Sequence, residues 1–300
     1  MFSKSTWLHL RIPFSFFLMP VYFFALGVSP NFSGSRLFWS FIIIHLLLYP
    51  ASNGYNSYFD KDEKSIGGLK NPPPVNRGLY YISLILDCGA VVLGFIKIGA
   101  LFAIMLFIYG LISKAYSHPS IRIKKYPIGG WITVFVFQGF FSLLMCYVGI
   151  NDFGLNALGA SRVIIPAMLS SILIGASYPL TQIYQHDEDK KHGDKTMSLL
   201  LGIRGTFWFA LVAFLFATPG YFLFFSSFYS LRYAFVFLMA LSPVVIFFLY
   251  WFYSVWLDES KANFTNTMRL NFISAICLNI FFIYFFLDNT QVIQAIKGGY

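Results

Sequence analysis

Nine long apolar runs dominate this 300-residue chain, and the segments between them are too short to form a separate soluble domain. Hydrophobic residues make up 58% of the chain and charged residues only 11%, whereas soluble domains carry about 25% charged residues. Apolar runs of about 20 residues have the length that crosses a bilayer as a helix. The expected spans lie near residues 10–28, 37–57, 79–96, 98–115, 129–150, 163–184, 206–227, 233–255 and 270–288. The sequence therefore predicts an all-α polytopic membrane protein with one transmembrane domain over residues 1–300.

The distribution of Lys and Arg predicts the orientation of the chain. If the N-terminus lies in the cytoplasm, sixteen of the 21 cationic residues fall in cytoplasmic segments and five on the opposite side. This is the bias of the positive-inside rule, so we expect an integral protein of the cell's inner membrane, with its N-terminus cytoplasmic and its C-terminus outside. The same bias explains the net charge of +9 without a nucleic-acid partner, because the cations flank the lipid bilayer in short loops.

Seven of the twelve acidic residues lie in two short segments. The first, NGYNSYFDKDEKSIGG at residues 53–68, follows the second expected span. The second, QHDEDKKHGDKT at residues 185–196, follows the sixth span. Both spans are even-numbered, so their carboxyl ends emerge on the same side of the membrane. The two acidic segments can therefore converge on one site.

Residues three or four positions apart along a helix share a face, and each acidic segment contains such a series. In the first segment, if the helix continues past the apolar run, the shared face holds Asn53, Asn56, Asp60 and Lys64. In the second, it holds Gln185, Asp189 and either His192 or Gly193. Oxygen ligands gathered in this way suit Mg²⁺. The alternative is a solvated helix end at which Asp and Lys pair with one another.

A basic segment, YSHPSIRIKKYPIGGW at residues 116–131, lies on the same side of the membrane. Arg122, Lys124 and Lys125 are donors suited to phosphate oxygens. Acids that hold Mg²⁺ together with these cations predict a diphosphate site at the membrane interface. The alternative is an ordinary basic cytoplasmic loop.

The three segments resemble the motifs of the UbiA superfamily of intramembrane prenyltransferases. NSYFDKDEK, residues 56–64, is similar to the NDxxDxxxD motif after helix 2, and QHDED, residues 185–189, to the DxxxD motif after helix 6. YSHPSIRIKK is similar to the YSxPPxRxK stretch between helices 4 and 5. The resemblance spans about residues 10–290 and implies nine helices bundled around a lipid-facing substrate cavity. It also implies Mg²⁺-dependent transfer of a prenyl group from a polyprenyl diphosphate to an acceptor that the sequence does not identify.

The resemblance assigns roles to individual residues. Asn56, Asp60 and Asp189 match metal-binding positions, and Arg122 and Lys124 match diphosphate-binding positions. Further candidate metal ligands are Asn53, Glu63 and Gln185; further candidate diphosphate ligands are Lys64 and Lys190. The residues expected to be catalytic are Asp60, Asp189 and Lys64.

Lys64 and Gln185 depart from the family pattern, because they stand where the motifs usually have Asp. One interpretation is a single Mg²⁺, with Lys64 contacting a diphosphate oxygen in place of a second ion. Another is that a neighbouring acid compensates; the candidates are Asp62, Glu63, Asp187 and Glu188. A different donor or weakened catalysis is a third.

The sequence is compatible with other functions. A UbiA-like terpene cyclase would ionise the same diphosphate and close the chain on itself, and a non-catalytic lipid-binding homologue would tolerate the two departures. A transporter would place its binding groups near mid-membrane, often within inverted repeats, whereas most acids here lie at the membrane rim. The sequence predicts neither the acceptor, the prenyl length nor the oligomeric state.

His45 and Asp87 are ionisable residues near the middle of the second and third expected spans. Such residues are costly in hydrocarbon and usually face a cavity or one another. Because the two lie at similar depth, we hypothesise that they contact each other.

Overall fold

The computed structural model describes residues 3–152, 154–290 and 292. Within that part of the chain, nine helical segments are long and apolar enough to cross a membrane. They are Lys4–Gly27, Gly34–Asp60, Arg77–Lys97, Ala100–Ser117, Pro127–Ile150, Ser161–His192, Met197–Phe228, Leu231–Leu257 and Phe264–Asn289. Each coincides with one of the nine expected spans, so the predicted all-helical membrane architecture is confirmed.

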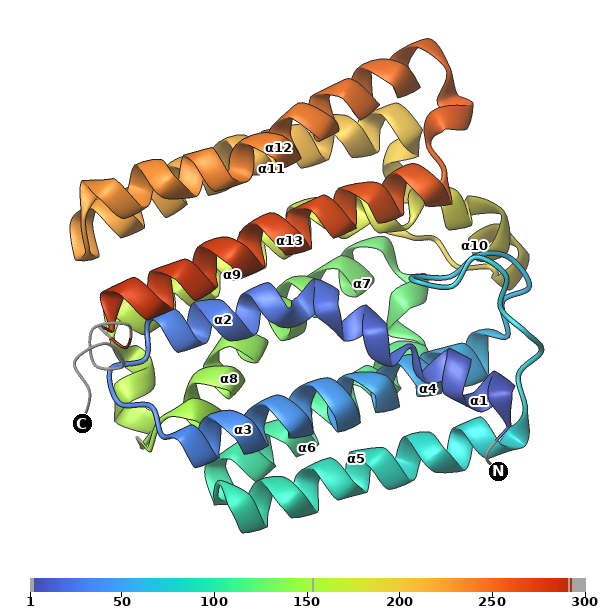
Figure 1. Cartoon of the computed structure of the whole chain (residues 1–300). Helices are drawn as coiled ribbons and strands as arrows, with labels where there is room; N and C mark the ends of the chain where they lie inside the picture. The colour runs from blue at the N-terminus through green and yellow to red at the C-terminus, as the bar shows by residue number, and fades with distance from the viewer. Residues whose placement is uncertain (1–2, 153, 291, 293–300) are drawn as a thin grey trace.

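Several of these spans are built from more than one helix. The α-helices are α1 (Lys4–Leu10), α2 (Met19–Gly27), α3 (Gly34–Ile42), α4 (Tyr49–Asp60), α5 (Arg77–Lys97), α6 (Ala100–Ser117), α7 (Pro127–Val134), α8 (Ser142–Ile150), α9 (Ser161–Ser177), α10 (His186–His192), α11 (Met197–Phe228), α12 (Leu231–Leu257) and α13 (Phe264–Asn289). A 3₁₀ segment, Ile12–Leu18, joins α1 to α2, and the π-helices Ile43–Leu48 and Phe135–Phe141 join α3 to α4 and α7 to α8. Figure 1 shows α10 and the loop that follows α4 at the same end of the molecule.

The π-helix at Phe135–Phe141 packs closely on α9 through Ser171. The Ser171 hydroxyl donates to the carbonyl of Phe135 at 2.7 Å and accepts from the amide of Phe140 at 2.7 Å. It therefore satisfies backbone groups that the widened turn leaves without an ordinary helical partner. Gly139 makes this approach possible, since a Cβ at that position would overlap Ser171. The contact fixes the position of α9, whose side chains line the cavity described below.

An aromatic cluster joins four helices at the end of the bundle away from α10. Phe24 of α2 stacks on Phe282 of α13 with ring centroids 4.4 Å apart. Tyr221 of α11 stacks on Phe237 of α12 at 4.6 Å, and Phe24 lies 5.6 Å from Tyr221. All four side chains are almost fully buried. Buried aromatic pairs of this kind contribute large apolar areas to packing, so the cluster ties the first span to the last three.

The hypothesised contact between His45 and Asp87 is wrong. Asp87 forms an ion pair with Lys114 of the neighbouring helix α6, because the long side chain of Lys114 extends along the helix and Gly110 leaves space beside the carboxylate. The His45 ring instead packs edge-on against Tyr22 and Tyr49, with centroids 5.5 and 5.3 Å away. Similar depth in the membrane did not predict which helix faces which.

Candidate active site

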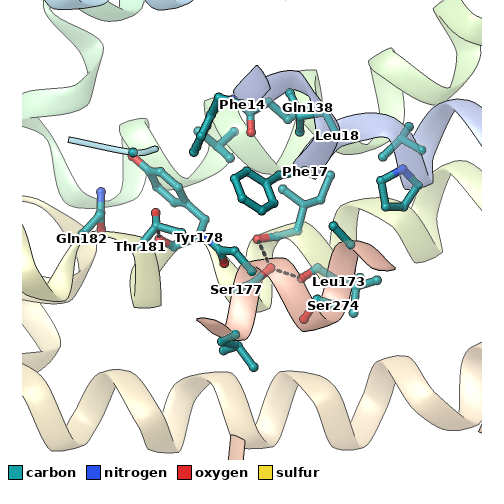
Figure 2. Close-up of a pocket in the computed structure, with 18 of the residues that line it drawn as sticks. Phe14, Phe17, Leu18, Gln138, Leu173, Ser177, Tyr178, Thr181, Gln182 and Ser274 are labelled. Atoms are coloured by element: carbon teal, nitrogen blue, oxygen red, sulfur yellow. Dashed lines mark hydrogen bonds between the residues drawn. The ribbon is translucent and has the colours of Figure 1, made fainter. Parts of the chain in front are cut away.

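A cavity of about 710 Å³ runs through the bundle from the acidic segments to the aromatic cluster. Its charged end is lined by residues of both acidic segments and of the basic segment: Asn53, Asn56, Asp60, Asp62, Lys124, Gln185, Glu188, Asp189 and His192. Its interior is mostly apolar and aromatic, and Figure 2 shows Phe14, Phe17 and Leu18 of the first span facing Tyr178 at the end of α9. This combination can hold an amphiphile with an anionic head and an apolar tail.

Helix α4 presents its polar face to the cavity as far as Asp60. Asn53, Asn56 and Asp60 all line the cavity, as their spacing predicts. The helix then ends, because Lys61 adopts a left-handed conformation with φ 51°. Lys64 therefore lies beyond the helix, where it forms an exposed ion pair with Asp187 at 2.8 Å.

Helix α10 carries the second acidic segment. It ends at Gly193, whose φ of 72° is the left-handed conformation that favours glycine at this position. Glu188, Asp189 and His192 lie on the face of α10 that lines the cavity, and Gln185 lines it just before the helix begins. The Asp189 carboxylate accepts a hydrogen bond from the Thr196 hydroxyl at 3.0 Å. The two acidic segments thus meet across one cavity.

Four charged side chains form a network beside the cavity. Arg122 donates to Asp194 through Nε at 2.8 Å and Nη2 at 2.9 Å, and its Nη1 lies 3.3 Å from Asp60. Lys124 forms an ion pair with Asp60 and lies 3.8 Å from Asp194. Asp60 and Asp194 are each only 3% exposed, so both carboxylates depend on these cations for compensation. Of this network, Asp60 and Lys124 line the cavity.

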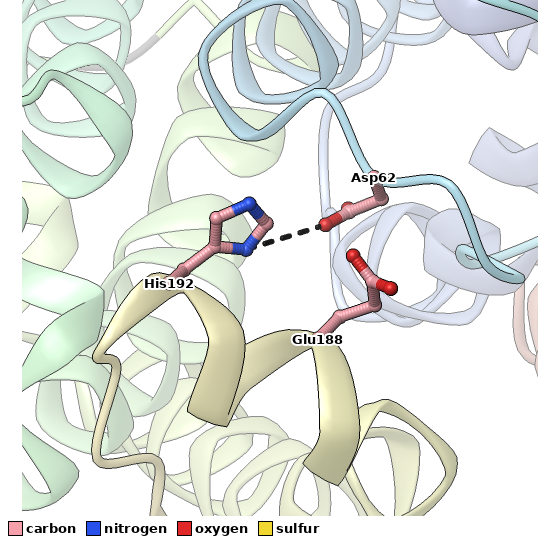
Figure 3. Close-up of side chains that lie close together, drawn as sticks. All are labelled: Asp62, Glu188 and His192. Carbon is pink, nitrogen blue, oxygen red and sulfur yellow. Dashed lines mark ion pairs between the residues drawn. The ribbon is translucent and has the colours of Figure 1, made fainter.

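A second group of side chains has the composition of a metal site. Asp62, Glu188 and His192 each offer one ligand atom, and these atoms lie within 4.8 Å of one another. Figure 3 shows the two carboxylates and the imidazole converging from the loop after α4 and from α10. Burial, together with the nearby negative charge of Asp60, raises the pKa of Asp62 to about 6. A bound cation would relieve this concentration of acids.

Three of the predicted site residues lie on the exposed side of the junction between α4 and α10. Glu63 pairs with Lys191 at 2.9 Å, Lys64 pairs with Asp187, and Lys190 is exposed to solvent. Contact with a ligand inside the cavity would require these side chains to leave the positions that they occupy here. Their assigned roles remain predictions.

Sequence reasoning missed one basic residue of the cavity. Arg11 lines the charged end and donates to the carbonyl oxygens of Asn53 at 3.2 Å and Gly67 at 3.3 Å. It stands at the start of the first span, where the sequence marks it only as one more cytoplasmic cation. Its position before Pro13 in an otherwise apolar run is the one signal that sets it apart. The sequence predicts either His192 or Gly193 on the polar face of the second acidic segment and assigns neither of them a role.

The fold and the site define a helical integral membrane protein whose cavity joins a charged rim to an apolar interior. The model of the UbiA prenyltransferase family matches residues 15–273. The chain belongs to this family, which confirms the resemblance seen in its motifs. No curated protein matches the chain.

Solved structures share the fold. A UbiA homolog from Archaeoglobus fulgidus bound to DMAPP and Mg²⁺ is similar with a TM-score of 0.65 and 18% identity, over 97% of this chain and 100% of that one. The homolog bound to GPP and Mg²⁺ gives 0.63 and 18%, over 94% and 99%. A structure of digeranylgeranylglyceryl phosphate synthase gives 0.60 and 16%, over 96% and 98%. At these identities the likeness establishes the fold.

Proposed function

We propose that this protein transfers a prenyl group from a polyprenyl diphosphate to an acceptor in the membrane, with a divalent cation at the charged end of the cavity. The observation that carries the proposal is the meeting of both acidic segments and Lys124 around the mouth of one apolar cavity. Relatives of the same fold bind DMAPP or GPP together with Mg²⁺, which supports the same class of donor here.

Each part of the cavity has a chemical task in this reaction. Lys124 and Arg11 would donate hydrogen bonds to diphosphate oxygens and stabilise the charge of the leaving group. A bound divalent cation supplies further neutralisation of the diphosphate. Among the predicted metal ligands, Asn56 and Asp189 line the cavity and are free of ion pairs within the described residues.

The apolar interior accounts for the fate of the prenyl group. Loss of diphosphate leaves an allylic cation, and Phe14, Phe17 and Tyr178 line the cavity next to the charged end. Aromatic faces attract cations, and an apolar wall excludes the water that would capture the cation first. We also propose that the charged end faces the cytoplasm of the inner membrane, with the N-terminus inside, because that orientation satisfies the positive-inside rule.

The test is release of diphosphate from a panel of polyprenyl diphosphates by the purified protein in detergent, with Mg²⁺ or a chelator. We expect metal-dependent release, reduced about a hundredfold or more in Asp189→Asn. The matched control is Asp152→Asn. Asp152 lies in the segment after α8, where it is exposed and pairs with Arg36. Equal release by Asp189→Asn and the wild type would contradict the proposal.

A further inference from the structure

The residues at the two family motifs make a weak metal site in this chain. Asp60 is already compensated by Arg122 and Lys124, which form ion pairs with its carboxylate. Ser57, Lys64 and Gln185 replace three acids that the motifs usually carry, and Lys64 points to Asp187 on the exposed surface. Of the two carboxylates that stand at motif positions, Asp60 and Asp189, only Asp189 lines the cavity without an ion pair within the described residues. Without a substrate diphosphate to supply further oxygen ligands, a single free carboxylate binds a divalent cation weakly.

The missing negative charge is supplied by neighbouring residues of the same two segments. Asp62, Glu188 and His192 come from both acidic segments, and all three line the cavity. Nδ1 of His192 lies 3.8 Å from Oδ1 of Asp62. Glu188 is 5% exposed, and its Oε2 has no hydrogen-bond partner among the described residues. A buried carboxylate oxygen that faces another carboxylate and lacks a donor is costly unless a cation occupies the space between them.

We propose that Asp62, Glu188 and His192 form the principal metal site of this protein, displaced from the motif positions, and that it selects first-row transition ions such as Mn²⁺ over Mg²⁺. The selectivity follows from the imidazole, because nitrogen ligands favour transition ions whereas Mg²⁺ prefers oxygen ligands and water. The site lies at the charged end of the cavity, so its use in catalysis rests on the proposed function. The binding of a metal ion by these three residues does not depend on the proposed function.

The experiment measures metal binding without a donor. Mn²⁺ is titrated into the full-length protein in detergent, and electron paramagnetic resonance reports the bound fraction and any hyperfine coupling from a ligand nitrogen. We expect about one tightly bound Mn²⁺ per chain with nitrogen coupling, and displacement by Mg²⁺ only at concentrations about tenfold or more above those of Mn²⁺.

Variants with matched controls connect the signal to the three residues. His192→Gln should abolish the nitrogen coupling and weaken Mn²⁺ binding about tenfold or more. His186→Gln should keep both, since the His186 ring is on the same helix but bonds to Ser198. Glu188→Gln should weaken binding without removing the coupling, whereas Glu259→Gln, an exposed acid in the loop after α12, should change neither.

The outcomes separate this inference from the proposed function. Nitrogen-coupled Mn²⁺ lost in His192→Gln establishes the site even if no diphosphate is ever released. Wild-type binding without nitrogen coupling, or equal affinity for Mn²⁺ and Mg²⁺ that His192→Gln leaves unchanged, overturns the inference. In that case Mg²⁺-dependent release of diphosphate would still support the transferase.

Discussion

Charge compensation by single residues decides how the rim of the cavity is built. Arg122 compensates more buried negative charge than a single ion pair would, because its planar guanidinium contacts both Asp60 and Asp194, which are buried. Lys cannot reproduce this arrangement, since its ammonium is a single point charge without the fork of donors. The sequence marks Arg122 as a diphosphate ligand, and the structure adds that it holds the two acidic segments to the basic one.

Arg122→Ala should lower the free energy of unfolding by about 3–5 kcal/mol, because it leaves two buried carboxylates with one cation. Arg122→Lys should recover only part of this loss. Chemical or thermal unfolding in detergent measures both. Lys70→Ala is the control, since Lys70 is exposed, and its effect should stay within about 0.5 kcal/mol. A loss as small in Arg122→Ala would contradict the assigned role.

At the scale of elements, irregular helices and close crossings position the cavity walls. The π-helix at Phe135–Phe141 and α9 meet at Gly139 and Ser171, and both elements line the cavity. The start of α13 meets the acidic end, where Phe264 packs on Tyr184 at 5.3 Å, and Phe282 of the same helix reaches the aromatic cluster. Helix α13 therefore runs along the whole length of the cavity.

Gly139→Ala should destabilise the protein by about 1–3 kcal/mol, because the added methyl group forces the π-helix away from α9. Gly89→Ala is the matched control. Gly89 lies inside α5 with open space beside it, so Ala should stabilise the helix by up to about 1 kcal/mol. If the crossing is as close as described, the changes in the free energy of unfolding of the two variants, measured in the same detergent, have opposite signs. The same sign in both would argue against it.

The length of the cavity predicts the length of the donor. Met268 and Phe282 of α13 both line it, and their separation of fourteen residues corresponds to about 21 Å of helix. An isoprene unit adds four bonds of about 1.5 Å each, which extend to about 5 Å. The cavity therefore suits a chain of about four isoprene units, and Tyr221, Phe237 and Phe282 form its floor.

We expect kcat/KM for diphosphate release to rise from two to about four isoprene units and then fall, since each further buried methylene adds binding energy until the floor is reached. Tyr221→Ala should move the optimum to longer donors. Tyr221→Phe keeps the ring and should leave the optimum unchanged. An optimum that is the same in the wild type and in Tyr221→Ala would show that the floor lies elsewhere.

For the whole molecule, hydropathy was enough to predict the nine spans. Because the second and sixth spans are both even-numbered, the sequence also predicted that the two acidic segments lie on the same side of the membrane. The partners within the site were not predictable. Lys64 does not lie on the polar face of α4, because the helix ends at Asp60, where the next residue, Lys61, adopts a left-handed conformation. The pairing of Arg122 with Asp194 depends on how the loop after α6 packs against the segment after α10, where the backbone amide of Lys195 donates to the carbonyl of Lys125 at 3.0 Å.

Product analysis by mass spectrometry tests the proposed reaction most directly. The purified protein in lipid vesicles is incubated with a donor of about four isoprene units, a divalent metal and a crude lipid extract. We predict a new lipid whose mass equals an acceptor plus the prenyl group minus one hydrogen. This lipid should be absent when the Asp189→Asn variant replaces the wild type. Release of diphosphate with only a cyclised or hydrolysed prenyl product would contradict transfer, and an unchanged donor would contradict ionisation as well.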